Sequence, residues 1–405
     1  MTPDVPPGFE DATREALAKA APQGATTIEA TPFEWIDPAH IPPREWLYGR
    51  HLIRGFVSVT VGAGGGGKSS IEIAEALAMA TGRDLVGARV HGGPFTVWYF
   101  NLEDPADELQ RRVTATMQRY GIPPDEVAGR LYLDSGRKQP LCIAHETRNG
   151  IEIVEPVVDA LVSELRRRGI DGLIVDPFVS SHGVPESDNG AIDRVAKTWG
   201  RVAEAANCAV ELVHHIRKTG DAEVTAESAR GAVALTAAAR SVRVLQKMTK
   251  DEAAKAGIDD HERRAYSRAE RDKANMSPPE AAAWFRMVPV PLANGDHVAV
   301  AEAWNWPDAF EGLTAADLRK VQDALHGRNF RKAQTADQWA GHEIGRVLGF
   351  ETESKAGKAR AGQLLKEWIE RGALVSVNVR GEDRKEHPCV AVGEWMAAPS
   401  PAEVA

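Results

Sequence analysis

Eight consecutive residues carry the strongest chemical motif of the 405-residue sequence: Gly62-Ala63-Gly64-Gly65-Gly66-Gly67-Lys68-Ser69. They fit the pattern G-x-x-x-x-G-K-[ST], in which backbone N–H groups surround phosphates at the start of a helix. Lys68 is suited to neutralise the β- and γ-phosphates of a nucleotide, and the hydroxyl of Ser69 is suited to bind Mg²⁺. A flexible glycine-rich loop is the alternative. The predicted nucleotide-binding residues are Gly62, Gly64, Gly65, Gly66, Gly67, Lys68, Ser69 and Ser70.

Acidic residues follow two later apolar segments. Asp176 ends the segment 172–176, and we expect it to share Mg²⁺ with Ser69 at the edge of a sheet where ligands bind. Glu103 and Asp104 follow the apolar run Phe95–Leu102. We expect Glu103 to act as the general base for water and Asp104 to cap the next helix. The alternative is that both acids only cap that helix.

Two histidines and several arginines could act on the same phosphates. His214 and His215 end the apolar run from Ala209, where a histidine could hydrogen-bond a γ-phosphate and report its loss. Arginines from a neighbouring subunit complete the active site in many oligomeric nucleotide hydrolases. Spacing alone does not choose among the later candidates, which are Arg230, Arg240 and Arg243.

The elements that must position these groups alternate between apolar runs and helical patterns. Such alternation predicts an α/β fold, with a mostly parallel sheet and helices on both faces. The predicted strands are 56–61, 95–102, 130–134, 172–176 and 209–214, and the predicted helices are 69–79, 106–120, 151–168 and 192–206, followed by a helix-to-strand passage over 233–246.

Residues 312–395 predict a separate, small α+β domain. Helical patterns cover Ala315–Leu325, Ala336–Leu348 and Lys355–Arg371, and a hairpin of Leu374–Val379 with Cys389–Val392 follows. Three helices and a hairpin are the outline of a winged helix. Lys355, Lys358 and Arg360 could contact DNA phosphates from the third helix. The alternative is a solvated basic face on an interaction domain.

The remaining segments and the composition set the limits of these predictions. We expect a flexible tail over 1–30, an ATPase domain over 31–310 that begins with an aromatic and Pro-rich extension (31–50), and a disordered tail over 396–405. The net charge is −9, whereas residues 312–388 hold 14 basic and 11 acidic side chains. No apolar run is long enough to cross a membrane and no secretory signal is visible, so we expect a cytoplasmic protein without a membrane partner.

In their order, these motifs resemble the RepA-type branch of the RecA-like ATPases, the plasmid and phage replicative helicases that form hexameric rings. The resemblance rests on six motifs: the P-loop, Tyr-x-x-x-Glu-Asp, strand–Asp–Pro, His-His-x-x-Lys, Ala-Arg-Gly and Lys273-Ala274-Asn275. The resemblance implies ATP and Mg²⁺ as ligands and a homo-oligomeric, RecA-like fold. It also implies the following roles: Glu103 as base, Asp176 as Walker B residue, His215 as γ-phosphate sensor, Arg112 as the arginine after the Glu-Asp pair and Arg240 as the finger donated to the adjacent subunit.

The same resemblance implies that two loops meet single-stranded DNA, namely Ser180–Asn189 and Lys218–Ala229 with Lys218 at its start. The first hypothesis is therefore an ATP-hydrolysing DNA motor that acts as a helicase in replication, with duplex DNA as a second partner through the C-terminal domain. The first loop is acidic and carries no lysine or arginine. That favours an alternative, a DNA-binding regulator or loader whose ATPase works as a switch without unwinding. A P-loop kinase of small metabolites is a third, weaker reading.

Overall fold

The computed structural model describes residues 29–216, 232–278, 280–381 and 383–396, in two compact units, Met1–Pro43 and Arg44–Ala405. In the first unit, one 3-10 helix, η1 (Pro38–His40), interrupts an extended segment whose large apolar side chains are exposed. The predicted tails 1–30 and 396–405 fall almost entirely outside the described residues. In the second unit, β1 (Trp46–Tyr48) and β2 (Leu52–Ile53) form a small antiparallel pair.

A nine-stranded sheet is the centre of the second unit, in the order β13-β12-β11-β10-β3-β9-β8-β4-β5. Six neighbouring strands are parallel, and the three strands at one end are antiparallel. This arrangement confirms the predicted mostly parallel α/β fold. The strands are β3 (Val57–Ala63), β4 (Val97–Asn101), β5 (Leu131–Ser135), β8 (Gly172–Asp176), β9 (Ala209–Ile216), β10 (Ser241–Lys247), β11 (Tyr266–Ala274), β12 (Ala283–Pro291) and β13 (His297–Trp304).

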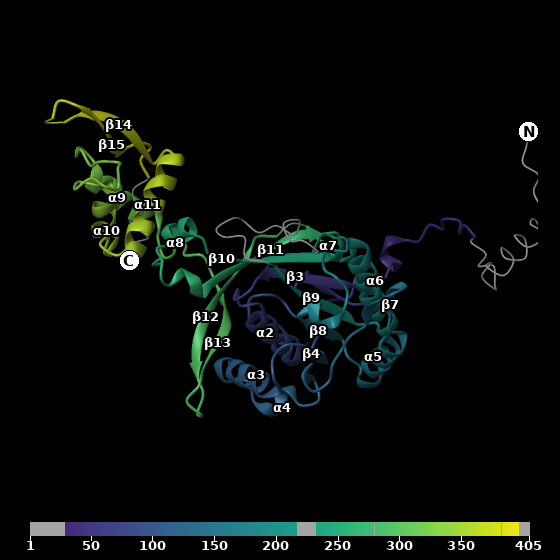
Figure 1. The fold of residues 1–405 in the computed structure, drawn as a ribbon. Coiled ribbons are helices and arrows are strands. Elements are labelled where there is room, and N and C mark those ends of the chain that lie inside the picture. The colour runs from purple at the N-terminus through teal and green to yellow at the C-terminus, as the bar shows by residue number, and fades with distance from the viewer. Residues whose placement is uncertain (1–28, 217–231, 279, 382, 397–405) are drawn as a thin grey trace, which may run out of the picture. The chain divides into compact units, whose positions relative to one another are not determined.

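Helices cover both faces of the sheet, as Figure 1 shows. Side chains of α2 (Lys68–Thr81) and α3 (Ala106–Tyr120) build one apolar cluster, near the short α4 (Pro124–Val127). Side chains of α5 (Glu155–Arg168), α6 (Asn189–Ala206) and α7 (Ala232–Ala238) build the other. The central strands are buried on both faces, which explains why β4 and β8 are mostly apolar and why the polar residues of β3 and β9, such as Thr60 and Glu211, are buried and hydrogen-bonded to each other.

The structure differs from the sequence prediction in several elements. The helix expected from Ile151 begins only at Glu155, because β6 (Ala144–Thr147) and β7 (Gly150–Ile153) form a hairpin before it. The antiparallel strands β11 to β13 were not predicted at all, nor were α8 (Lys250–Ala256) and the 3-10 helices η2 (Phe178–Ser181) and η4 (Arg263–Ala265).

The C-terminal region contains the three predicted helices and the predicted hairpin, although the second helix begins at Ala340 and not at Ala336. The elements are α9 (Ala315–Leu325), α10 (Ala340–Leu348), α11 (Lys355–Glu370), β14 (Leu374–Arg380) and β15 (Glu386–Val392). They enclose an apolar cluster of their own in which Trp339 and Trp368 are buried. Across the described part of the chain, none of the helices is both long and apolar enough for a membrane span.

Candidate nucleotide-binding site

The glycine-rich motif forms the turn between β3 and α2. Gly65 and Gly67 have φ angles of 72° and 90°, a left-handed conformation that a residue with a Cβ adopts only with strain. The Lys68 Nζ donates to the carbonyl oxygens of Gly62 (2.7 Å) and Ala63 (2.9 Å), so the lysine folds back over its own loop. The predicted strand, loop and helix are therefore present in the arrangement that binds phosphates at a helix start.

Lys68 is only 4% exposed. Burial lowers its pKa to about 8, although Asp176, Glu72 and Glu103 act in the opposite direction. A buried ammonium group with few solvent contacts gains more from a phosphate than a solvated one would.

Asp176 ends β8 at the same edge of the sheet and is 1% exposed. The Tyr99 hydroxyl donates to its Oδ2 at 2.7 Å, and His215 Nε2 lies 3.7 Å from its Oδ1. Burial alone would raise the pKa of Asp176, but His215, Ser69 and Tyr99 lower it below the ordinary value. Asp176 is therefore held as a carboxylate beside the Ser69 hydroxyl.

These two oxygen donors fit Mg²⁺, which typically takes one or two protein ligands together with phosphate oxygens and water. Among the described residues, His, Cys, Asp and Glu form no group of three that could hold a metal by themselves. The donor set thus fits a cation shared with a nucleotide, with Ser69 and Asp176 as the residues that would hold it.

Glu103 stands on a turn at the end of β4, next to β8. The Asn101 Oδ1 accepts from the backbone N–H groups of Glu103 (3.0 Å) and Asp104 (2.7 Å). Arg137 donates to the Glu103 carbonyl, and the Ser135 hydroxyl donates to that of Asp104. The turn is fixed, while the Glu103 side chain stays exposed.

The expectation that Asp104 caps α3 is wrong. Pro105 occupies the N-cap position without a side-chain hydrogen bond. Asp104 instead pairs with Arg112 at 2.9 Å, because Arg112 lies about two turns into α3 on the side that faces Asp104 and its long side chain reaches back. Arg112 also pairs with Glu108 at 3.0 Å. The two carboxylates, Asp104 and Glu108, hold the Arg112 guanidinium beside the cavity described next.

A cavity of about 660 Å³ lies over the phosphate loop. From Gly65 to Ser70 every residue lines it, as do Arg112 and His215, whereas Gly62 and Gly64 do not. Gly62 instead packs closely against Leu245. The structure thus brings the predicted residues of the loop, β8 and β9 together at one edge of the sheet.

The opposite wall of this cavity was missed by the sequence analysis. It comes from the end of β10, from η4 and from the antiparallel strands, through Lys247, Arg264, Ser267, Met287, Asp296 and His297. Ser267 donates to the Gly66 carbonyl at 3.0 Å, and Ser70 donates to that of Ala299 at 3.0 Å. Valine at every second position, at Val288 and Val290 and again at Val298 and Val300, was an available signal for two of these strands.

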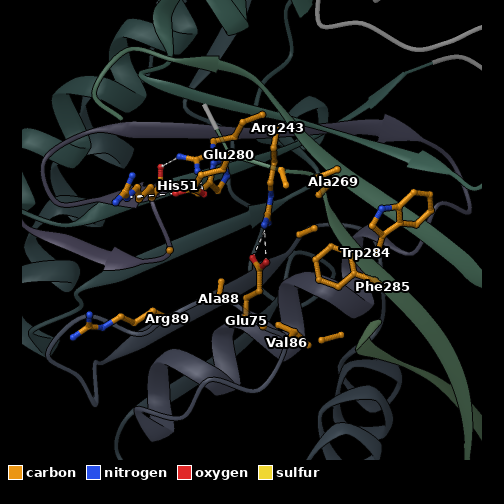
Figure 2. A pocket seen from close by; sticks show the side chains of 18 of the residues that line it. His51, Glu75, Val86, Ala88, Arg89, Arg243, Ala269, Glu280, Trp284 and Phe285 are labelled. Carbon is orange, nitrogen blue, oxygen red and sulfur yellow. Dashed lines mark hydrogen bonds and ion pairs between the residues drawn. The ribbon is translucent and has the colours of Figure 1, made fainter. Parts of the chain in front are cut away.

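The three arginine candidates have different environments. Arg230 lies outside the described residues. Arg243 is 7% exposed and binds Glu75 twice at 2.6 Å and Glu72 at 2.8 Å, deep beside a second cavity (Figure 2). Arg240 is exposed and lies over the Phe56 ring. It precedes the strand whose Ser241 pairs with Ser58, so it stands at the edge of the sheet opposite the phosphate loop.

The DNA-contact predictions fall on residues with mixed surroundings. Lys218, with the loop Lys218–Ala229, lies outside the described residues. Lys355 pairs with Asp259 at 2.5 Å. Arg360 donates to the carbonyls of Ala309 and Glu311. The acidic loop Ser180–Asn189 follows β8, at the edge that holds the phosphate loop.

We expect nucleotide binding to take up a proton at Lys68. Phosphate charge raises the pKa of the bound lysine from about 8, so a lysine that is partly neutral at higher pH becomes protonated. Calorimetric titration in buffers of different ionisation enthalpy should show proton uptake above this pH and almost none well below it. A Lys68→Arg variant, whose guanidinium does not titrate, should show none at either pH. Uptake that persists in Lys68→Arg would assign the proton to another group.

We expect Arg243→Met to be strongly destabilising. The substitution leaves Glu72 and Glu75 buried without their cation, and breaking a buried ion pair in this way costs about 3–5 kcal/mol. The free energy of unfolding from denaturant titration measures the effect. Arg148→Met, at an exposed arginine, should change it by no more than about 0.5 kcal/mol. Equal effects of the two substitutions would contradict a structural role for the Arg243 pairs.

The comparison with known protein families agrees with this geometry. Residues 23–221 match the family model described as AAA domain. The match includes the phosphate loop, Glu103, Asp176 and His215, and it ends before β10. This stretch of the chain is an AAA domain of the P-loop NTPase type.

Proposed function

We propose that the protein is an ATP-hydrolysing DNA motor of the RepA type that acts as a helicase in plasmid or phage replication. The observation that carries the proposal is that its catalytic groups lie at the two opposite ends of the parallel strands. Lys68, Ser69, Asp176 and His215 meet at one edge, beside Glu103, whereas Arg240 is exposed at the other. Arg240 can therefore complete only the site of another copy, and the active unit is a homo-oligomer, with a hexameric ring as the proposed form.

The chain's own groups account for hydrolysis of ATP. The oxygen of a water attacks the γ-phosphorus, the bond from that phosphorus to the ADP oxygen breaks, and Glu103 accepts a proton from the water. Lys68 offsets the charge on the phosphates, and Arg240 of the neighbour stabilises the charge of the transition state. Mg²⁺, when bound at Ser69 and Asp176, screens the phosphate oxygens. His215 is placed between Asp176 and the cavity, where it can sense the γ-phosphate.

The DNA-binding part of the proposal rests on position and charge. The loops after β8 and β9 follow the strands that carry Asp176 and His215, so a change at the phosphates can reach them. We infer that they contact single-stranded DNA, and that the C-terminal domain is a winged helix that contacts duplex DNA through Lys355, Lys358 and Arg360. Arg360 already donates to the carbonyl oxygens of Ala309 and Glu311, and Lys355 pairs with Asp259, which leaves Lys358 as the most available of the three cations.

Strand separation is tested with a forked DNA duplex, ATP and the full-length protein. We expect displacement of the labelled strand, and ATP turnover that rises when single-stranded DNA is added. Mass measurement should show an oligomer under the same conditions. A monomer whose rate of ATP hydrolysis does not change when single-stranded DNA is added would overturn the motor proposal.

One observation favours a second function, that of a DNA-binding regulator or loader. The loop Ser180–Asn189 carries acidic residues and no lysine or arginine. It therefore offers no cation to bind the phosphates of DNA, and its carboxylates repel them. Such a protein would bind DNA and hydrolyse ATP in the same assay, but it would not displace the strand.

A further inference from the structure

The cavity beside Arg243 in the ATPase domain has no part in the function proposed above. Its volume is about 800 Å³, within the usual range for sites that bind small molecules. Of the residues that the structure describes, none lines both this cavity and the one over the phosphate loop. Strand β10 contributes Arg243 to the first and Lys247 to the second, so the two cavities lie toward opposite ends of that strand. We call the first the Arg243 cavity.

The floor of the Arg243 cavity is flat and apolar. Ala269 on β11 pairs with Ala283 on β12. Ala303 on β13 pairs with Phe285, two residues further along β12, so all four side chains share the face of the sheet that is turned toward α2. The alanines leave the space above them unfilled, and Gly87 approaches Ala303 without a side chain. Such a floor suits a planar ring system, which gains dispersion contacts over its whole face.

Positive charge exceeds negative charge along the cavity wall, which holds four arginines but only two glutamates. Glu75 is already paired with Arg243. Glu280 is already paired with both Arg50 and Arg271. Because the acids of the wall are in use, the excess of cations attracts an anion from solution.

The cations of the wall also lie close to one another. Burial lowers the pKa of Arg271, and the positive charges of Arg50 and Arg243 lower it further. The Gly49 N–H donates to the Arg89 carbonyl at 2.7 Å, which places Arg89 next to Arg50. Arg89 is exposed, and its side chain has no ion-pair or hydrogen-bond partner among the described residues. An anion bound here would reduce the repulsion among the guanidinium groups and accept hydrogen bonds from Arg50 and Arg89.

The apolar and cationic parts of the wall lie at different ends of the cavity. Figure 2 shows Trp284 and Phe285 on one side of the Arg243–Glu75 pair and Arg89 on the other. A wholly apolar ligand would cover the guanidinium groups without giving them a partner, which is unfavourable. A small inorganic anion would leave the alanine floor uncovered. The wall therefore matches a ligand with flat rings at one end and an acidic group at the other.

We propose that the Arg243 cavity binds a small planar anion, that is, an aromatic or heterocyclic ring system with one carboxylate, sulfonate or phosphate group. The rings lie over Ala269 and Ala283 beside Phe285, and the acidic group meets Arg50 and Arg89. Binding at this site needs neither ATP nor DNA, so the inference goes beyond the proposed motor function and does not rest on it.

The probe for the site is 8-anilinonaphthalene-1-sulfonate, a planar anion whose fluorescence rises in apolar surroundings. The full-length protein is titrated with it in the presence of Mg²⁺ and a saturating, non-hydrolysable ATP analogue. We expect saturable binding that the analogue does not displace, because the two cavities have separate walls. Displacement of the probe by the analogue would place it at the phosphate loop and overturn the proposal.

Two variants test the two parts of the site, with N-phenyl-1-naphthylamine as a neutral probe that has the same rings without the sulfonate. Arg50→Gln/Arg89→Gln removes two cations and should weaken binding of the sulfonate by about tenfold or more, since hydrogen bonds to charged groups are lost. Binding of the neutral probe should change by less than about twofold. Ala283→Leu fills the space above the floor and should weaken binding of both probes by about tenfold or more.

The controls make the same chemical changes at exposed positions elsewhere. Arg130→Gln/Arg148→Gln alters the charge equally, and Ala160→Leu adds the same volume on α5. Neither should change the affinity for either probe, and an unchanged affinity for the ATP analogue shows that each variant is folded. If Arg50→Gln/Arg89→Gln weakens both probes equally or neither, the ligand is not an anion. If Ala283→Leu leaves both affinities unchanged, the probes bind outside the Arg243 cavity and the proposal is wrong.

Discussion

Glu103→Gln should lower the rate constant for ATP hydrolysis by about 10²–10⁴-fold, the usual contribution of a general base. The glutamine keeps the size of the side chain and the turn held by Asn101, but it cannot accept a proton from water. Because Glu103 is not needed to hold the phosphates, the affinity for ATP should stay within a few-fold of the wild-type value. Single-turnover hydrolysis and equilibrium binding of ATP measure the two quantities.

Glu146→Gln is the matched control, since it makes the same change at an exposed carboxylate of the β6–β7 hairpin. It should leave both quantities unchanged. Hydrolysis that survives in Glu103→Gln and disappears in Asp104→Asn would show that the base is the neighbouring acid. The ion pair of Asp104 with Arg112 makes that outcome unexpected, because the guanidinium already occupies a carboxylate oxygen of Asp104.

Arg240→Ala should lower ATP turnover by about 10³-fold or more, as the loss of an arginine finger does. The affinity for ATP should change little, since Arg240 stands at the far edge of its own sheet and, in the neighbouring site, is proposed to act on the transition state. The same position predicts complementation. In a mixture with Glu103→Gln, some sites combine Glu103 of one chain with Arg240 of another, so turnover should rise above that of either variant alone.

A control for the arginine substitution is Arg148→Ala, at an exposed residue of the β6–β7 turn. Turnover in that variant should match the wild type. If Arg240→Ala retains full turnover, another arginine supplies the charge. If turnover is lost but mixing restores none of it, Arg240 acts within its own chain or only in folding.

The parallel half of the fold could be predicted because its strands are buried on both faces. Leu173–Val175 is a continuous apolar run that ends in Asp176, and Val57–Val61 alternates valine with the small buried residues Ser58 and Thr60 before it reaches the motif, so pattern and chemistry point to the same edge. Lys68, Asp176 and His215 could be predicted as neighbours because each follows or ends one of these parallel strands.

The antiparallel strands could not be predicted in the same way. Tyr266–Ala274 holds several charged residues and only some of its positions are buried, so it has no continuous apolar run. Asp104 was misassigned for a related reason: a capping role depends on local sequence, whereas its pairing with Arg112 depends on how the helix begins. The choice between Arg240 and Arg243 as the arginine finger could not be made from the sequence. It required the pairing of β10 with β3, which buries Arg243 and leaves Arg240 exposed.

The position of β10 has a consequence for folding autonomy. This strand lies between β3 and the antiparallel strands, and it follows residue 221, where the AAA domain match ends. A polypeptide stopped there would leave the strand that carries the phosphate loop with an open side, and Glu72 and Glu75 without Arg243. It would also lack the wall formed by Ser267 and Met287. The smallest fragment that folds by itself and binds a nucleotide should therefore extend through β13, well beyond the stretch that family resemblance alone would mark out.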